Sequence, residues 1–303
     1  MIICGIDAGG STTKCVLLNE TGAVLAETTA GPANYQAGME RAIREIQAAL
    51  SLACVKSGVD RIDVLGIGLA GAGRPQEFER FKTAAPTLPH VTEYFLTNDG
   101  EIAVLGAHKG APGLIVIAGT GSIVYGRRLD GRMVRCGGWG SVLGDEGSGY
   151  WIGLQAAKAA IVDFEGRGPA TLLTSRIMAA LKLEELWDLR PLVYQNNLAR
   201  KELASLTPLV IELARRGDEI AERIIQAAVA ELALLVKATR EKLDFTPNAI
   251  AVMGGLFRTP LLRETFTVQL PELKVFDPQY PAVYGAAIYG AIQAGIDPGS
   301  LVR

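Results

Sequence analysis

Apolar residues near the start of the chain gather in short runs that end at glycine or at polar turn residues. Runs of this length, rich in aliphatic and β-branched side chains, are typical of strands. The predicted strands of this region are Ile2–Asp7, Thr13–Leu18, Ala23–Thr29, Val64–Leu69 and Tyr94–Thr97. Helical spacing predicts helices over Ala37–Val55 and Gln76–Ala84, and a third helix that begins at Asp99 with Asn98 near its cap. The first part of the chain is therefore predicted to be α/β.

The same order of elements recurs farther along the chain. Leu114–Ala118, Ile123–Leu129 and Met133–Cys136 are predicted strands, with a glycine turn after the first and an Asp-Gly hairpin signal after the second. The N-terminal region has the same order of elements: a strand, a glycine turn, a second strand, a hairpin turn and a third strand. Two interpretations stay open at this point: an internal duplication, or a chance similarity of two meanders.

The remaining chain is first helical and then α/β again. Residues 150–243 are predicted as mostly helical, with the clearest helix over Asp218–Leu243. The final predicted elements are the strands Ala249–Met253 and Lys274–Phe276 and the helices Thr259–Leu270 and Pro281–Ala294. Small residues in the last helix, such as Ala287 and Gly290, allow another element to approach closely, although an ordinary core explains them nearly as well.

Length and charge narrow the class of protein. The 303 residues are enough for two domains, and a net charge of −2 gives no broad basic field for nucleic acid or an anionic membrane. No signal-peptide pattern and no bilayer-spanning apolar run is found. The four cysteines are scattered without a CxxC pair, so reduced thiols in a cytoplasmic protein are expected. Two histidines near loops give little support to a Ser-His-Asp triad or a His-based metal site.

Two glycine-rich turns carry the chemistry of anion binding. Asp7–Lys14 joins two predicted strands, and its glycines allow backbone N–H groups to face an anion. The turn Gly119-Thr120-Gly121-Ser122 repeats this chemistry, so two such loops facing each other would hold a polyphosphate from both sides. Neither loop matches the Walker pattern or opens a helix as a dinucleotide fingerprint does. The candidate phosphate contacts are Gly9, Gly10, Ser11, Thr12, Thr13, Lys14, Gly119, Thr120 and Gly121.

Two aspartates stand at ends of predicted strands, and each has two interpretations. Asp7 could hold Mg²⁺ through water molecules, or it could stabilise a turn. Asp99 could act as a general base, or it could complement the dipole of the helix that it begins. Spacing alone favours the dipole role for Asp99.

The stretch Cys136–Trp151 combines six glycines with Trp139 and Asp145. Glycine is costly to order, so this density indicates a backbone that bends sharply beside a ligand. A flat ring beside a carboxylate suits a sugar, which has apolar C–H faces and many hydroxyl donors. The alternative is a glycine-rich hairpin with a packed tryptophan.

Taken in order, these motifs resemble the nucleotide-binding superfamily of sugar kinases, Hsp70 and actin. Its members fold as two ribonuclease-H-like domains around an ATP cleft. Asp7–Lys14 and Ala118–Ser122 resemble the two phosphate motifs, Met253–Arg258 the adenosine motif, and Asn98–Leu105 and Ala282–Ala291 the connecting helices. The resemblance implies domains over 1–110 and 111–303, a helical insertion at about 150–243, and a last helix that could pack back on the N-terminal domain.

Within that superfamily, the long motif of residues 137–151 is similar to the N-acetylglucosamine kinase branch, which is grouped with BadF/BadG-type ATPases. By this resemblance Asn34, Tyr35, Gly71, Asp99, Trp139, Gly140 and Asp145 contact the sugar. Ala214, Gly254, Gly255 and Thr259 join the phosphate-loop residues as ATP contacts. Tyr35 stands where some relatives carry another aromatic residue, which bears on the acetyl-group pocket.

The resemblance implies ATP-dependent phosphorylation of an amino sugar, with N-acetylglucosamine first, at the 6-hydroxyl. Asp99 then becomes the general base, which reverses the interpretation from spacing, and Mg²⁺ accompanies ATP near Asp7. A glucosamine kinase or broad hexokinase is the alternative enzyme, and an ATPase that activates a partner enzyme is the alternative from another class. The chain lacks an evident cysteine pair for the iron–sulfur cluster of such activators. A cytoplasmic homodimer with a small-molecule sugar substrate is expected.

Overall fold

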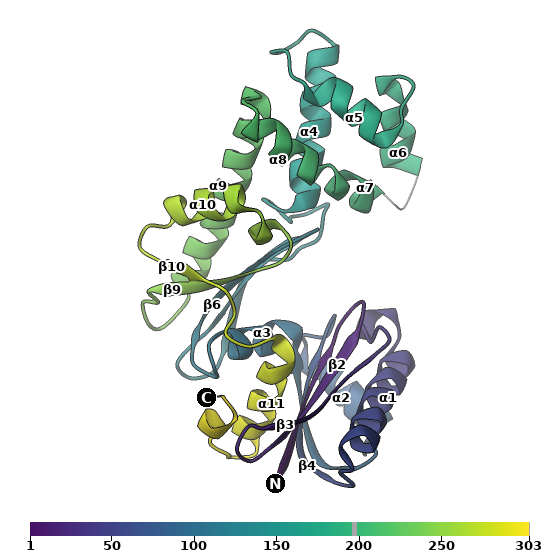
Figure 1. Ribbon diagram of the computed structural model, residues 1–303, viewed down its shortest axis with the longest axis vertical. Coiled ribbons are helices and arrows are strands. Elements are labelled where there is room, and N and C mark those ends of the chain that lie inside the picture. The colour runs from purple at the N-terminus through teal and green to yellow at the C-terminus, as the bar shows by residue number, and fades with distance from the viewer. Residues whose placement is uncertain (196–198, 303) are drawn as a thin grey trace. The chain divides into compact units, whose positions relative to one another are not determined.

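The chain forms two compact units, which are described separately. The computed structural model describes residues 1–195 and 199–302 (Figure 1). The first unit contains residues 1–113, 127–133 and 277–303, and the second contains residues 114–126 and 134–276. Besides the N-terminal 113 residues, the first unit thus includes the C-terminal segment and the short segment 127–133.

The first unit is built on a five-stranded sheet with the order β3-β2-β1-β4-β5. β1 pairs antiparallel with β2 and parallel with β4, and β4 pairs parallel with β5. The strands are β1 (Ile2–Ala8), β2 (Thr13–Asn19), β3 (Val24–Ala30), β4 (Ile62–Leu69) and β5 (Val91–Asn98). The helices are η1 (Tyr35–Ala37), α1 (Met39–Ser57), α2 (Pro75–Ala84), α3 (Asp99–Ala107), α11 (Ala282–Gln293) and η4 (Pro298–Leu301).

The second unit has its own five-stranded sheet, with the order β10-β9-β6-β7-β8. Its strands are β6 (Gly113–Ala118), β7 (Ser122–Arg127), β8 (Met133–Gly137), β9 (Ala249–Met253) and β10 (Lys274–Phe276). Its helices are α4 (Gly149–Phe164), α5 (Leu173–Leu181), η2 (Leu186–Asp188), α6 (Leu189–Gln195), α7 (Ala199–Ser205), α8 (Thr207–Arg215), α9 (Glu219–Arg240), η3 (Leu256–Arg258) and α10 (Pro260–Gln269). The helical stretch predicted over 150–243 is therefore confirmed, with α9 begun by an Asp218 side chain that accepts from two backbone N–H groups.

The two sheets repeat one topology. Each follows the order third, second, first, fourth and fifth strand, when the strands of each sheet are numbered along the chain. The recurrence seen in the sequence therefore reflects a repeated strand order. Chance similarity of two three-stranded meanders would not explain why the fourth and fifth strands also take the same places, so the internal duplication is favoured. The α/β class predicted from the sequence is confirmed.

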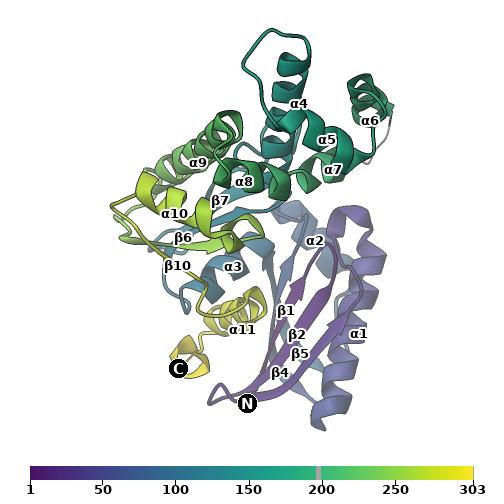
Figure 2. The same cartoon turned by 45° about the horizontal axis from the view of Figure 1, so that its top comes forward.

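The two faces of the first sheet bury different partners because strand residues alternate between faces. Cys4, Ile6 and Leu17 pack with residues of α1 in one apolar cluster. Ile3 and Val16 pack with α11 in another. Figure 2 shows α1 beside the sheet and α3 beside α11.

Glycines set how closely α11 approaches its neighbours. A Cβ on Gly66 of β4 would lie 1.9 Å from the Ala286 carbonyl oxygen, and one on Gly285 of α11 would lie 1.8 Å from the Ile102 carbonyl oxygen of α3. Backbone therefore meets backbone at both contacts, and no side chain larger than hydrogen fits between. Of the two interpretations of the small residues in this helix, close approach is the one observed.

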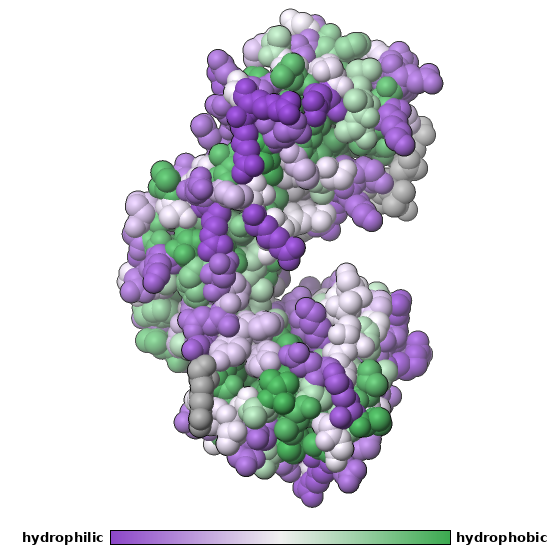
Figure 3. Space-filling model, in the orientation of Figure 1, coloured by the Kyte–Doolittle hydropathy of each residue, from purple (hydrophilic) through white to green (hydrophobic). Residues whose placement is uncertain are grey.

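The surface mixes polar and apolar residues. Figure 3 shows hydrophilic residues interspersed with apolar ones on the visible face of each unit. Within the part of the chain that the structure describes, no helix combines the length and the apolar character needed to cross a bilayer.

Candidate active site

The carboxyl ends of three parallel strands meet at one edge of the first sheet. Ala8 at the end of β1 is in register with Leu69 of β4, and Leu69 is in register with Asn98 of β5. Such edges of open α/β sheets are where ligands bind. This register gathers the first phosphate loop, the segment after Leu69 and the start of α3 within the first unit.

The first phosphate loop is held by its own backbone. The Gly9 N–H donates to the Thr12 carbonyl at 3.0 Å, and the Gly9 carbonyl accepts from Ala33 N at 2.9 Å. Ser11 and Thr12 are exposed, as an anion-binding turn requires. Thr13 differs from the expectation, because it is fully buried and its hydroxyl donates to the Gly31 carbonyl at 2.7 Å. The Thr13 hydroxyl therefore links the loop to Gly31 and is not exposed for binding.

Asn34 lies between two glycines at this edge. A Cβ on Gly71 would stand 2.6 Å from its Oδ1, and one on Gly10 would stand 3.8 Å from its Nδ2. Asn34 is the N-cap of η1, and its Oδ1 also accepts from Gln36 N. Gly71 has a φ of +81°, a conformation that favours glycine. The structure thus brings Asn34, Gly71 and the first phosphate loop together, with Tyr35 partly buried next to them.

Asp99 is the first residue of α3, and Asn98 is its N-cap. The Asn98 side chain accepts from Glu101 N, so the predicted cap is confirmed. The Asp99 side chain is accessible to solvent. The surrounding protein nevertheless raises the pKa of Asp99 above its ordinary value through desolvation, against backbone hydrogen bonds that lower it. A reachable carboxylate with a raised pKa has the properties of a general base.

Asp7 lies at the same edge, one residue before the end of β1. Its side chain shares a sheet face with Gly5, which is the face that meets α11. Burial raises the pKa of Asp7 to about 6, while Lys14, its register partner on β2, opposes this and the negative charge of Asp99 adds to it. Mg²⁺ prefers oxygen ligands, and the carboxylates of these two aspartates are ligands of that kind. Among the described residues, no three or more His, Cys, Asp or Glu side chains lie close enough together to hold a metal ion by themselves.

The second unit has a corresponding edge. β6 and β9 are parallel, with Ile117 in register with Met253, so the second phosphate loop and the Gly254-Gly255 turn are neighbours. A Cβ on Gly254, whose φ is +96°, would lie 2.2 Å from the Ala118 carbonyl oxygen. Gly255 has nothing within 4 Å of such a Cβ, and Thr120 is exposed. This edge therefore presents open backbone from both turns.

Two further predicted ATP contacts lie in the second unit. Ala214 is near the end of α8, and Thr259 is the N-cap of α10, without a side-chain capping bond. Ala214 is 6% exposed, so it could offer a ligand little more than a small apolar contact.

Trp139, in the glycine-rich stretch, has an exposed side chain. Its side chain is 66% exposed, and the Arg135 guanidinium lies 5.6 Å from the ring centroid, within cation–π range. Gly140 next to it has a φ of +85° and open space around it. The accessible aromatic face predicted from the sequence is present.

Asp145 is in a different situation from Trp139. It is 3% exposed and has a φ of +61°. Its Oδ1 accepts from Ser122 N at 3.4 Å, and its Oδ2 accepts from Arg200 Nη2 at 2.6 Å. In this arrangement its carboxylate already has partners within the protein, which differs from the open acceptor expected from the sequence.

Sequence reasoning missed two charged side chains that the fold delivers to these regions. Arg200 comes from α7, 55 residues beyond Asp145, and no local pattern marks it. Glu101, two residues after Asp99, accepts from Thr97 Oγ1 at 2.6 Å and pairs with Arg127 at 3.4 Å. The sequence placed Glu101 inside a predicted helix, but it gave no sign that Arg127 would be its partner.

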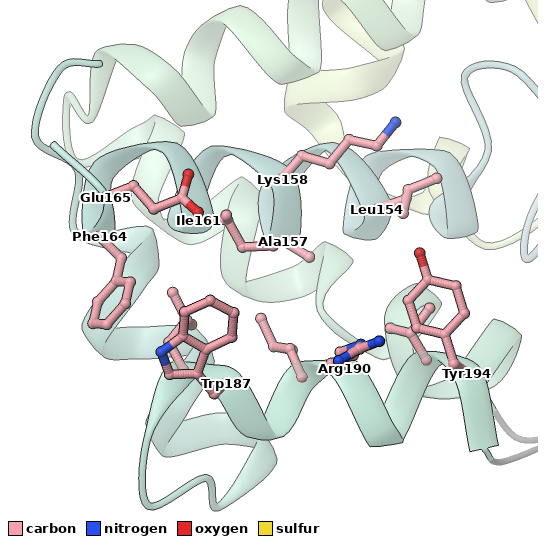
Figure 4. A pocket seen from close by; sticks show the side chains of 12 residues that line it. Leu154, Ala157, Lys158, Ile161, Phe164, Glu165, Trp187, Arg190 and Tyr194 are labelled. Atoms are coloured by element: carbon pink, nitrogen blue, oxygen red, sulfur yellow. The ribbon is translucent and has the colours of Figure 1, made fainter. Parts of the chain in front are cut away.

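A separate apolar groove lies in the helical insertion of the second unit. Its volume is about 350 Å³, and Figure 4 shows the rings of Trp187 and Tyr194 on the side of η2 and α6, facing α4 across it. The Lys158 ammonium points away from that side. The groove contains none of the residues that the sequence singled out.

Comparisons with known proteins cover almost the whole chain. Residues 4–290 match the family model of the BadF/BadG/BcrA/BcrD ATPase family. The chain is 34% identical over 296 residues to an N-acetylmuramic acid/N-acetylglucosamine kinase of Clostridium acetobutylicum, covering 94% of this chain and 97% of that protein. It is 30% identical to an N-acetyl-D-glucosamine kinase of Dictyostelium discoideum, over 89% of this chain and 90% of that one.

A solved structure gives the same result for the fold. A candidate N-acetylglucosamine kinase from Chromobacterium violaceum aligns with a TM-score of 0.76 and 28% identity, over 95% of this chain and 98% of that one. The resemblance drawn from the motifs is confirmed. With a family model matched over nearly its full length, this chain belongs to the BadF/BadG/BcrA/BcrD ATPase family.

Proposed function

We propose that the protein is an ATP-dependent kinase of amino sugars that transfers phosphate to the 6-hydroxyl, with N-acetylglucosamine as the first candidate substrate. One observation carries the proposal: Asp99 is solvent-accessible, has a raised pKa and shares a sheet edge with the first phosphate loop. The relatives named as kinases of N-acetylglucosamine support the choice of sugar.

Asp99 is the proposed general base. A sugar hydroxyl is a weak nucleophile, and a carboxylate that accepts its proton as the bond to phosphorus forms supplies typically 10²–10⁴-fold of rate. In phosphoryl transfer most of the remaining catalysis is positioning and charge stabilisation. The backbone N–H groups of the two phosphate loops, Lys14, and the hydroxyls of Ser11, Thr12 and Thr120 would bind the phosphates of ATP.

Mg²⁺ fits the donor set of the first unit. Asp7 would hold it through water, since one carboxylate with retained waters is the usual way in which proteins bind Mg²⁺ with phosphates. When bound, the ion would neutralise phosphate charge. The Asp7 carboxyl, with its raised pKa, would be drawn into its charged form by the cation.

Sugar recognition is assigned to the residues that the family motifs single out. Trp139 would offer its exposed face to the C–H face of the ring, and Asn34 would hydrogen-bond a hydroxyl or the acyl group beside Tyr35. Gly71 and Gly140 would allow close backbone approach. Asp145 is paired with Arg200, so it would accept a sugar hydroxyl only when Arg200 moves away from its carboxylate.

A sugar panel tests the proposal and separates it from its alternatives. ADP formation would be measured with N-acetylglucosamine, N-acetylmuramic acid, glucosamine, glucose and N-acetylmannosamine at 1 mM each, roughly the upper end of ordinary KM values. Turnover with an N-acetylated sugar and 6-phosphate as the product support the proposal. Preference for glucosamine or glucose makes the alternative kinase correct. ATP hydrolysis that no sugar accelerates would instead favour an ATPase acting on a partner protein.

A further inference from the structure

The guanidinium of Arg200 lies against the second phosphate loop. Its Nη2 is 2.6 Å from Asp145 Oδ2, and a Cβ on Gly121 would stand 2.7 Å from the same Nη2. A side chain at Gly121 would have to displace the guanidinium from its present position. Arg200 is therefore the immediate neighbour of the Gly119–Ser122 turn, although it comes from a helix far along the chain.

Asp145 fixes the direction of this cation. The carboxylate is buried, while the side chain of Arg200 is 47% exposed. Ser122 N donates to the other carboxylate oxygen, so Asp145 joins the phosphate loop and Arg200 directly. A charge-assisted bond of this kind orients the guanidinium and leaves its remaining N–H donors on the exposed side.

The helix that carries Arg200 is fixed to the same frame as the loop. A Cβ on Gly153 of α4 would lie 1.8 Å from the Leu203 carbonyl oxygen of α7, so the two backbones touch. Thr207 Oγ1 donates to the Gly149 carbonyl, and Gly149 N donates to the Gly119 carbonyl. The first turn of α4 thus connects the base of the phosphate loop to the region of α7 and α8.

The two phosphate loops differ in charge within their own sequences. The first, Asp7–Lys14, begins with the acidic Asp7 and ends with the cation of Lys14, whereas Gly119-Thr120-Gly121-Ser122 contains no charged residue. We propose that Arg200 supplies the missing cation and binds a phosphate group of the nucleotide at the second loop, with Asp145 as its positioning residue. This inference rests on the proposed use of ATP. Arginine suits the role because its planar fork pairs with phosphate oxygens through two N–H groups.

Nucleotide binding without sugar tests the proposal, because it needs no turnover. Calorimetry would compare ADP with adenosine for the wild-type protein, Arg200→Ala and Arg200→Lys. We expect Arg200→Ala to weaken ADP binding at least tenfold and to change adenosine binding less than twofold, with Arg200→Lys between the two for ADP. Arg223→Ala removes an equal charge from an exposed pair on α9 and should leave both affinities unchanged.

The outcomes separate the possible roles. Unchanged ADP binding in Arg200→Ala overturns the proposal, and so does an equal loss of ADP and adenosine, which would mean that Arg200 only maintains the fold. If Arg200→Ala does not fold, because Asp145 is left buried and unpaired, the double variant Asp145→Asn with Arg200→Gln replaces it and is judged by the same ADP-to-adenosine ratio. A wild-type protein that binds no ADP contradicts the proposed function itself, and the role of Arg200 with it.

Discussion

At the residue scale, two aspartates at one sheet edge have raised pKa values for the same physical reason. Protein atoms around Asp7 and Asp99 replace water, and a carboxylate loses more by that exchange than a carboxylic acid does. The negative charge of Asp99 also raises the pKa of Asp7. Such pairs are common where catalysis occurs, since a binding edge holds charge that a stable core would avoid.

Replacement of Asp99 by Asn should abolish proton acceptance and keep the shape of the site. We expect kcat to fall by roughly 10²–10⁴-fold, with ADP affinity within about threefold of the wild type. A coupled ADP assay and calorimetry measure the two quantities. Near-normal turnover would remove Asp99 from the role of base.

The pH dependence of kcat/KM should reflect the raised pKa of Asp99. The active form is the carboxylate, which is present above its pKa in the folded protein and is lost as the pH falls through that value. We expect the acidic limb to begin above the ordinary aspartate value of 3.8. A rate profile that stays level down to pH 4 would contradict this assignment.

Asp7 should make the protein less stable at neutral pH than at acidic pH. Its folded pKa of about 6 exceeds the unfolded value of 3.8, so the folded state binds more protons between these values. The free energy of unfolding therefore falls as the pH rises through this window, by at most about 3 kcal/mol from this group. Asp7→Asn should raise stability at pH 8 and have little effect at pH 4 in urea titrations. The exposed Asp60→Asn is the control, and an equal change for both variants at pH 8 would contradict the account.

At the element scale, α11 depends on glycine at its contacts with the sheet and with α3. Hydrogen is the only side chain that fits where the backbones of β4 and α11 touch. The periodicity of apolar residues identified the helix, but periodicity does not say which neighbour comes so close.

Gly66→Ala should therefore force α11 away from β4. Its new Cβ would lie 1.9 Å from a backbone oxygen, and relief requires the helix to move. Overpacking of this kind destabilises by roughly 1–3 kcal/mol or more. Gly73→Ala is the control, because a Cβ there meets nothing within 4 Å. Equal urea midpoints for the two variants would show that α11 adapts without cost.

At the scale of the whole molecule, the chain passes between its two units more than once. Residues 127–133, from the last residue of β7 to the first residue of β8, pack within the first unit. The pair Arg127–Glu101 fixes this segment to α3, with both side chains nearly buried, at 11% and 13% exposure.

Arg127→Ala should destabilise the protein by about 3–5 kcal/mol, because Glu101 remains buried without its cation. The double variant Arg127→Met with Glu101→Gln should recover much of this loss. Lys82→Ala removes an exposed pair and should change stability by less than about 1 kcal/mol. Thermal and urea unfolding measure all three. A small effect of Arg127→Ala alone would mean that water reaches Glu101.

Light scattering in solution would test the expected homodimer. A mass near twice the chain mass of 32.1 kDa supports the expectation, and a mass near 32.1 kDa contradicts it.

The sequence by itself determined the elements of this fold, because each has a local cause. Alternating and helical apolar spacing, an asparagine cap at Asn98 and glycine turns act over a few residues, so the strands β9 and β10 were predicted to the residue. The family motifs predicted the two phosphate loops and the role of Asp99 for the same reason: each lies in one continuous stretch.

Tertiary structure decided which residues meet. Parallel register put Asp7 and Asp99 at one edge, and the packing of α7 on α4 placed Arg200 on Asp145 and the second phosphate loop. It also buried the Thr13 hydroxyl under Gly31. These contacts join residues far apart in the chain, and no local pattern of apolar and polar positions encodes them. The folded chain therefore decides which groups surround a charged side chain such as Asp145, and these groups decide what the side chain can bind.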